Sequence, residues 1–128
     1  MNAYAYLIGW RLVRFMPEKL AYRLFYLIGD YIYMRGGKAV SRLRFNMAKV
    51  SGVEGSNLDD LTKSAMRSYM RYWCDTFRFP DWSSARIMES VELVNEKVLT
   101  DQLDSGKGAV VALPHSGNWD HAAGYFLG

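Results

Sequence analysis

The sequence has 128 residues, 50% hydrophobic and 15% aromatic, and its 16 Lys and Arg against 13 Asp and Glu give a net charge of +3. This length and composition are typical of a folded protein with at most one globular domain, and they exclude disordered and collagen-like classes. One cysteine cannot form an internal disulfide, and with two histidines it is too little for the usual structural zinc sites. We therefore expect no bound metal.

Charge is distributed unevenly along the chain. Residues 1–50 hold nine Lys or Arg against two acids, a net +7, so the remainder carries −4. Basic residues interleaved with aromatic ones suit either a lipid surface with anionic head groups or an ordinary protein core. Nucleic acid is not expected, because no zinc-finger, homeodomain or RNA-recognition pattern is present. Charges also interrupt the apolar N-terminal segment too often for a spanning helix, so residues 1–55 are expected to lie on a membrane without crossing it.

Helical spacing dominates the first 79 residues. An apolar helix is predicted over residues 2–15, and Pro17 suits the first turn of a second helix that ends at the glycine pair 36–37. A third helix then precedes the polar loop at 51–55. The apolar positions at helical spacing are Leu20, Leu24, Leu27, Ile28 and Tyr31 in the second helix and Val40, Leu43, Met47 and Val50 in the third.

A long helix is predicted over residues 56–79. Ser56 and Asp59 resemble a capping box at its start, and Pro80 ends it. The apolar face predicted for this helix consists of Leu58, Leu61, Ala65, Tyr69, Tyr72 and Trp73, with Lys63, Arg67, Arg71 and Arg78 pointing outward.

The pattern changes after residue 80. Residues 90–94 are expected to form a strand, 96–104 a short helix, and the apolar run 109–113 a strand buried on both faces of a mainly parallel sheet. A further helix is expected after residues 116–118. This order predicts an α/β fold, in which N-terminal helices are followed by the start of a mainly parallel sheet with flanking helices. Because no closing element follows, we expect an N-terminal fragment of a larger domain.

Candidate chemistry lies where the predicted strand 109–113 ends. Open α/β sheets place ligands at this end of their strands, and His115 lies there, five residues before Asp120 in the first turn of the next helix. A carboxylate that accepts from one imidazole nitrogen leaves the other nitrogen able to take a proton from an alcohol. Such a pair is suited to base catalysis of hydroxyl attack on an acyl group, although a structural His115 is the alternative.

Four other side chains have simpler interpretations. Ser116 lacks the G-x-S-x-G elbow of an acyl-accepting serine, and His121 diverges from Asp120 on the helix, which disfavours a metal set with His115. Cys74 is expected to be a core or half-buried thiol, and Lys107 a solvated turn residue instead of a phosphate or coenzyme A ligand.

The stretch Leu-Pro-His-Ser-Gly-Asn-Trp-Asp at 113–120 resembles the H-x4-D/E signature of the lysophospholipid and lipid A type acyltransferases. Residues 16–22 and 42–47 are similar to N-terminal patterns of the same family, and the likeness is greatest to its members that acylate phosphatidylinositol mannosides. The resemblance implies that His115 is the base, that Asp120 is its partner carboxylate, and that Ser116, Gly117 and Asn118 contact substrate. Residues 1–128 would then be the N-terminal part of one acyltransferase domain, in which 1–55 face the membrane and 56–128 carry the motif.

The implied reaction transfers a palmitoyl-like acyl group from acyl-CoA to a mannose hydroxyl of a phosphatidylinositol mannoside. It needs no cofactor or metal and takes place at the cytoplasmic face of the plasma membrane, to which the protein binds peripherally. Two alternatives stand beside it. One is acylation of a lipid A precursor from acyl carrier protein, and the other is a helical membrane-binding module without catalysis.

Overall fold

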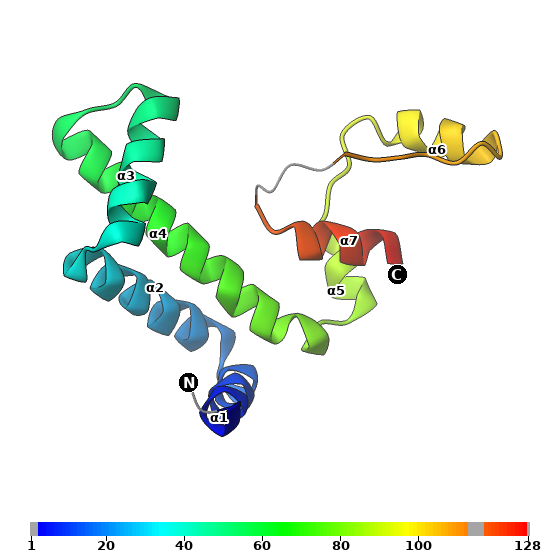
Figure 1. The fold of residues 1–128 in the computed structure, drawn as a ribbon. Helices are drawn as coiled ribbons and strands as arrows, with labels where there is room; N and C mark the ends of the chain where they lie inside the picture. The colour runs from blue at the N-terminus through cyan, green and yellow to red at the C-terminus, as the bar shows by residue number, and fades with distance from the viewer. Residues whose placement is uncertain (1–2, 113–116, 128) are drawn as a thin grey trace. The chain divides into compact units, whose positions relative to one another are not determined.

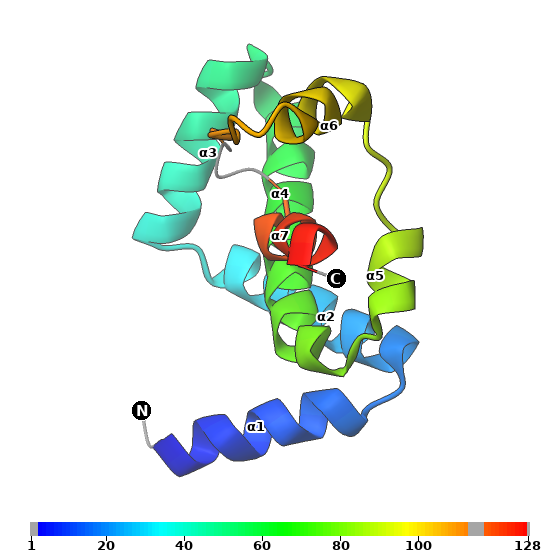
Figure 2. The same ribbon diagram turned by 90° about the vertical axis from the view of Figure 1, so that its right-hand side faces the viewer.

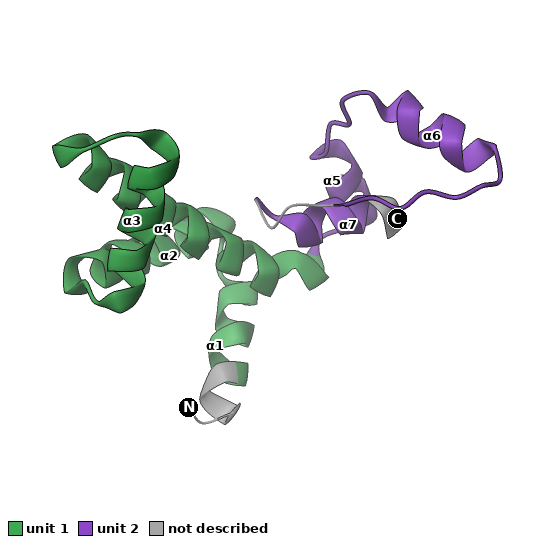
Figure 3. Cartoon of the chain, turned by 45° about the horizontal axis from the view of Figure 1, so that its top comes forward, with its two compact units in different colours: residues 1–81 green, residues 82–128 purple. Residues whose placement is uncertain are grey.

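The structure is a computed structural model that describes residues 3–112 and 117–127 (Figure 1). It divides into two compact units, one up to Asp81 and one from Trp82 onward (Figure 3). Each unit is described by itself. The expected division after residue 55 concerns which helices face a membrane, and it stays a prediction.

The predicted α/β fold is wrong for the residues that the structure describes, because all their regular elements are helices. A strand exists only where it pairs with another extended segment. Residues 91–93 and 109–112 are extended or irregular and have no such partner among the described residues. Val110 is fully exposed and Val111 is 56% exposed, so the apolar run that suggested a doubly buried strand is not buried here.

The first unit contains the four helices predicted for it. They are α1 (Ala3–Phe15), α2 (Glu18–Arg35), α3 (Lys38–Ser51) and α4 (Gly55–Arg78), followed by the 3-10 turn η1 (Phe79–Asp81). Gly36 and Gly52 follow α2 and α3 with φ of 66° and 67°, a conformation that L side chains rarely adopt. α4 is the longest helix, and α2 lies along it (Figure 1).

The core of this unit lies between α2 and α4. α2 contributes Ala21, Phe25 and Gly29, and a Cβ at Gly29 would lie 3.2 Å from Met70 Cγ, so the backbones approach closely there. The buried residues of α4 are Leu58, Thr62, Met66, Cys74 and Asp75. The predicted apolar face of α4 is therefore rotated by about one residue, which is 100° on a helix. Tyr69 and Trp73, assigned to that face, are 54% and 37% exposed.

Polar contacts also join α2 to α4. The Tyr22 hydroxyl donates to Asp75 Oδ1 at 2.6 Å, which supplies a partner for a carboxylate that is only 7% exposed. Burial, followed by the Asp75 hydrogen bond, raises the pKa of the Tyr22 hydroxyl. On the outer side of the contact, Arg67 forms an ion pair with Asp30 through two hydrogen bonds of 2.6 and 2.5 Å.

α1 runs across the end of α4 that leads into η1 (Figures 1 and 2). Arg78 Nη1 donates to the carbonyls of Val13 and Met16 at 2.8 and 2.7 Å, so a cation from α4 satisfies acceptors at the C-terminus of α1. Trp10 Nε1 donates to the Phe77 carbonyl at 2.8 Å, and Arg14 pairs with Asp81. The Arg14 hydrogen bond lowers the pKa of the Asp81 carboxyl.

The second unit contains α5 (Ser84–Glu89), α6 (Glu96–Asp104) and α7 (Trp119–Leu127). The helices over 96–104 and after residue 118 agree with the prediction, whereas α5 was not expected. α5 has an N-cap, since Ser83 Oγ accepts from the Arg86 N–H at 3.2 Å. Its single turn and a half is too short for a helical pattern to emerge from the sequence. α5 packs against α7.

We predict that Gly29→Leu lowers the free energy of unfolding of the first unit by about 2 kcal/mol or more, because the new side chain has no space between α2 and α4. Gly9→Leu is the matched control, since a Cβ at that helical glycine meets nothing within 4 Å. Urea unfolding followed by circular dichroism measures both. Equal stability of the two variants would contradict the close approach.

Candidate functional site

The predicted site falls only partly within the described residues. His115 and Ser116 lie outside them, so their roles as base and substrate contact stay predictions. Gly117, Asn118 and Asp120 are described.

The loop before α7 turns into the helix as the sequence predicts. Gly117 has φ of +66°, and Asn118 follows it as the cap residue of α7. Asn118 Oδ1 accepts from the His121 N–H at 3.1 Å, and its carbonyl accepts from the Ala122 N–H at 3.3 Å. The amide of Asn118, proposed as a substrate contact, therefore has a structural task as well.

Asp120 lies in the first turn of α7 and is half-buried. This is the predicted position for the partner carboxylate. A negative charge is stabilised at the N-terminus of a helix, where the backbone dipoles present their positive end. Asp120 thus occupies a position in α7 at which an acidic side chain stabilises the helix.

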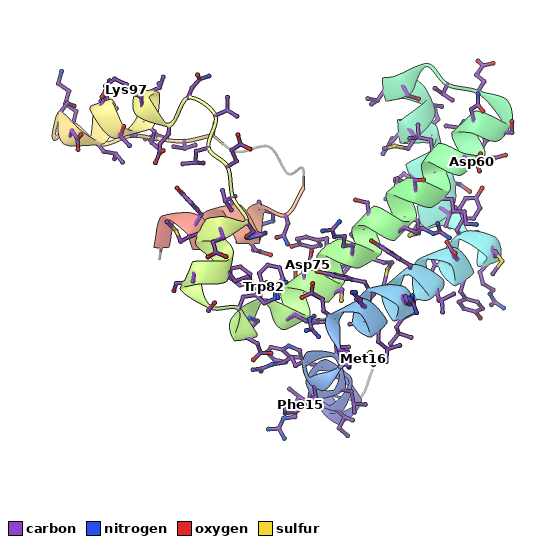
Figure 4. All side chains as sticks on the ribbon, turned by 180° about the vertical axis from the view of Figure 1, so that it is seen from behind. Phe15, Met16, Asp60, Asp75, Trp82 and Lys97 are labelled. Atoms are coloured by element: carbon purple, nitrogen blue, oxygen red, sulfur yellow. The ribbon has the colours of Figure 1, made fainter. Side chains whose placement is uncertain are left out.

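His121 has a larger role than the sequence suggested. Its Nε2 lies 2.7 Å from Ser90 Oγ at the end of α5, and the Trp82 ring contacts its ring edge-on at 5.0 Å between centroids. Trp82, labelled in Figure 4, lies two residues before the start of α5. The Arg86 guanidinium stacks on the Trp82 ring, 4.3 Å from its centroid. No sequence pattern pointed to these contacts, because Ser90 and His121 are 31 residues apart.

Two other candidates behave as expected. Cys74 is completely buried in the core of the first unit, and burial raises the pKa of its thiol to about 11, which disfavours a nucleophilic thiolate at neutral pH. Lys107 is exposed between Gly106 and Gly108, which both have positive φ. In residues 3–112 and 117–127, no three His, Cys, Asp or Glu side chains gather as a metal-ligand set.

The first unit exposes an apolar surface on α2, opposite its contact with α4. We call this surface the α2 outer stripe. It consists of Leu20, Leu24, Leu27, Tyr31 and Met34, which are 38–74% exposed. Arg23 and Arg35, both exposed, flank it at helical spacing. α1 also exposes apolar side chains, among them Phe15 at 87% (Figure 4).

Leu20, Leu24, Leu27 and Tyr31 are among the apolar positions whose spacing predicted α2. They therefore belong to an exposed face of that helix and not to the core. Among the described residues, no helix combines the length and the apolar character needed to cross a bilayer.

Residues 1–127 match the sequence profile of the bacterial lipid A biosynthesis acyltransferases, and the chain belongs to this family. It is 43% identical over 118 residues to the phosphatidylinositol mannoside acyltransferase of Mycolicibacterium smegmatis. The aligned region covers 91% of this chain and 38% of that protein. The protein of the same name from Mycobacterium tuberculosis is 38% identical over 122 residues, or 93% of this chain and 38% of its own length. The chain thus spans well under half the length of these relatives. No solved structure matches it significantly.

We predict that Asn118→Ala destabilises the second unit by about 1 kcal/mol, because the His121 N–H loses its acceptor. Asn118→Asp keeps the acceptor and is expected to retain the stability. Thermal unfolding of both variants measures the cap. If Asn118→Ala unfolds at the wild-type temperature, the capping role is wrong. An Asn118→Asp variant that is stable but has lost activity would reveal a separate contact with substrate.

Proposed function

We propose that the protein acts in glycolipid biosynthesis, transferring a palmitoyl-like group from acyl-CoA to a mannose hydroxyl of a phosphatidylinositol mannoside. The observation that carries this proposal is the His-x4-Asp motif at residues 115–120, in a chain that belongs to an acyltransferase family. The likeness to two phosphatidylinositol mannoside acyltransferases supports the mannoside acceptor. The family profile, described for lipid A biosynthesis, supports a lipid A precursor as the acceptor in a second candidate function, for which we propose acyl carrier protein as the donor.

In the proposed reaction His115 takes the proton of the acceptor hydroxyl while the oxygen attacks the thioester carbonyl. Asp120 accepts a hydrogen bond from the other imidazole nitrogen, which fixes the tautomer and stabilises the imidazolium. Collapse of the tetrahedral intermediate forms the ester, breaks the carbon–sulfur bond and returns the proton to the leaving thiolate. Asp120, the last residue of the motif, lies at the positive end of the α7 dipole, which in the proposed reaction favours the negative charge on the developing oxyanion.

A peripheral location at the cytoplasmic face of the plasma membrane is part of the same proposal. A lipid acceptor is reached most directly from the membrane surface. The α2 outer stripe supports this location, because its apolar side chains match the acyl boundary of a bilayer, and the flanking Arg23 and Arg35 match anionic head groups. The net charge of +7 over residues 1–50 adds to that attraction. No nucleic acid, metal or cofactor takes part in the proposed reaction.

We predict that His115→Ala, in the product of the complete gene, lowers acyl transfer about 100-fold or more, since the hydroxyl loses its base. Activity is measured as incorporation of radiolabelled palmitate into the acceptor, with circular dichroism as the control for folding. A folded variant with wild-type activity would contradict the role of His115 as the base, whereas no acyl transfer by the unaltered protein would leave the noncatalytic membrane-binding module as the better explanation.

We predict that Leu24→Gln with Leu27→Gln weakens binding to anionic phospholipid vesicles about tenfold or more, because two apolar side chains leave the lipid interface. The matched control is Val98→Gln with Leu103→Gln. Both residues lie on α6, outside the α2 outer stripe, and they are 76% and 53% exposed. Co-sedimentation with vesicles measures both. Equal binding by the two double variants would contradict a membrane role for α2.

A further inference from the structure

We infer that Ser90 and His121 are positioning residues for Asp120: the contact of Ser90 Oγ with His121 Nε2 fixes the first turn of α7 against α5, and with it the carboxylate one residue away. The inference rests on the proposed function, because it needs Asp120 to serve His115. It concerns residues outside the His-x4-Asp motif.

The donor and acceptor in this contact follow from the number of hydrogens. Ser90 Oγ lies 2.9 Å from the Ile87 carbonyl and 2.7 Å from His121 Nε2. A hydroxyl has one hydrogen, and the carbonyl can only accept, so the serine donates to Ile87. His121 Nε2 must therefore carry the hydrogen and donate to Ser90 Oγ. Any replacement at residue 121 needs an N–H donor at the same reach.

His121 is held on its other sides as well. The edge-on contact with Trp82 restricts rotation of the imidazole, and Trp82 is itself stacked under the Arg86 guanidinium. The backbone N–H of His121 donates to Asn118 Oδ1. Both the main chain and the side chain of His121 are thus fixed, and the adjacent Asp120 has little freedom to move along or around the helix axis.

This restraint has a chemical consequence, since a displacement of about 1 Å of a catalytic group can cost up to about 100-fold in rate. The Ser90–His121 contact lies at the turn that carries Asp120, so its loss is expected to lower turnover without changing the groups that bind substrate. A purely structural contact would instead change stability, and activity would fall regardless of whether a carboxylate is present at residue 120.

The experiment measures kcat and KM for acyl-CoA in the product of the complete gene. Ser90→Ala and His121→Phe are each expected to lower kcat about fivefold to tenfold with KM within about twofold. His121→Gln, which retains an N–H donor, is expected to stay within about twofold of wild type. Ser105→Ala is the matched control, because Ser105 ends α6 and donates to the Gln102 carbonyl in the same way; its kcat is expected to stay unchanged.

The deciding comparison is made in an Asp120→Asn background. There Ser90→Ala is expected to cause no further loss of kcat, because no carboxylate remains to be positioned. An equal further loss in that background, or a wild-type kcat for Ser90→Ala alone, would overturn the inference while leaving the proposed function intact. If Asp120→Asn itself keeps wild-type activity, the proposed role of Asp120 fails, and the inference fails with it.

Discussion

The close approach of α2 to α4 is the constraint on which the first unit depends. Gly29 has no side chain to separate the two backbones, so Phe25 and Cys74 reach a common core cluster with Val13 and Ala21. The buried Asp75 is tolerated in this contact because Tyr22 donates to it. α1 is attached in turn through Arg78, whose position depends on α4. The face of α2 that is turned away from this contact is thereby left for another partner.

In the second unit, the start of α7 is determined by short-range and medium-range contacts together. Gly117 turns the chain, Asn118 caps the helix, and Ser90 and Trp82, which flank α5, hold His121. These contacts place Asp120 in the first turn at the positive end of the helix dipole, which is where the proposed chemistry needs a carboxylate. The motif is thus supported by residues that do not belong to it.

Local signals predicted the helices well and the environment of their faces poorly. Pro17, the glycine pair at 36–37 and Pro80 act on the backbone within a few residues, so the helix ends followed from the sequence. Which stripe of α2 is buried depends on Met66 and Met70, about 40 residues away, and periodicity could not distinguish the Leu24 face from the Phe25 face. Asp120 was placed correctly because a helix start is local. Residues 90–94 and 109–112 misled, since an apolar run does not specify a partner strand.

The contrast between local signals and long-range packing also explains why the sequence did not predict the contacts of His121. Its contacts with Ser90 and Trp82 are set by the packing of α5 on α7.

Acyl transfer to a mannosylated lipid is the activity on which the proposed function depends. It is tested most directly by following thiol release from palmitoyl-CoA by the product of the complete gene, with and without a phosphatidylinositol mannoside. We predict that thiol release depends on this acceptor and yields the acylated mannoside. Release only with a lipid A precursor and an acyl carrier protein donor, or none with either acceptor, would contradict it.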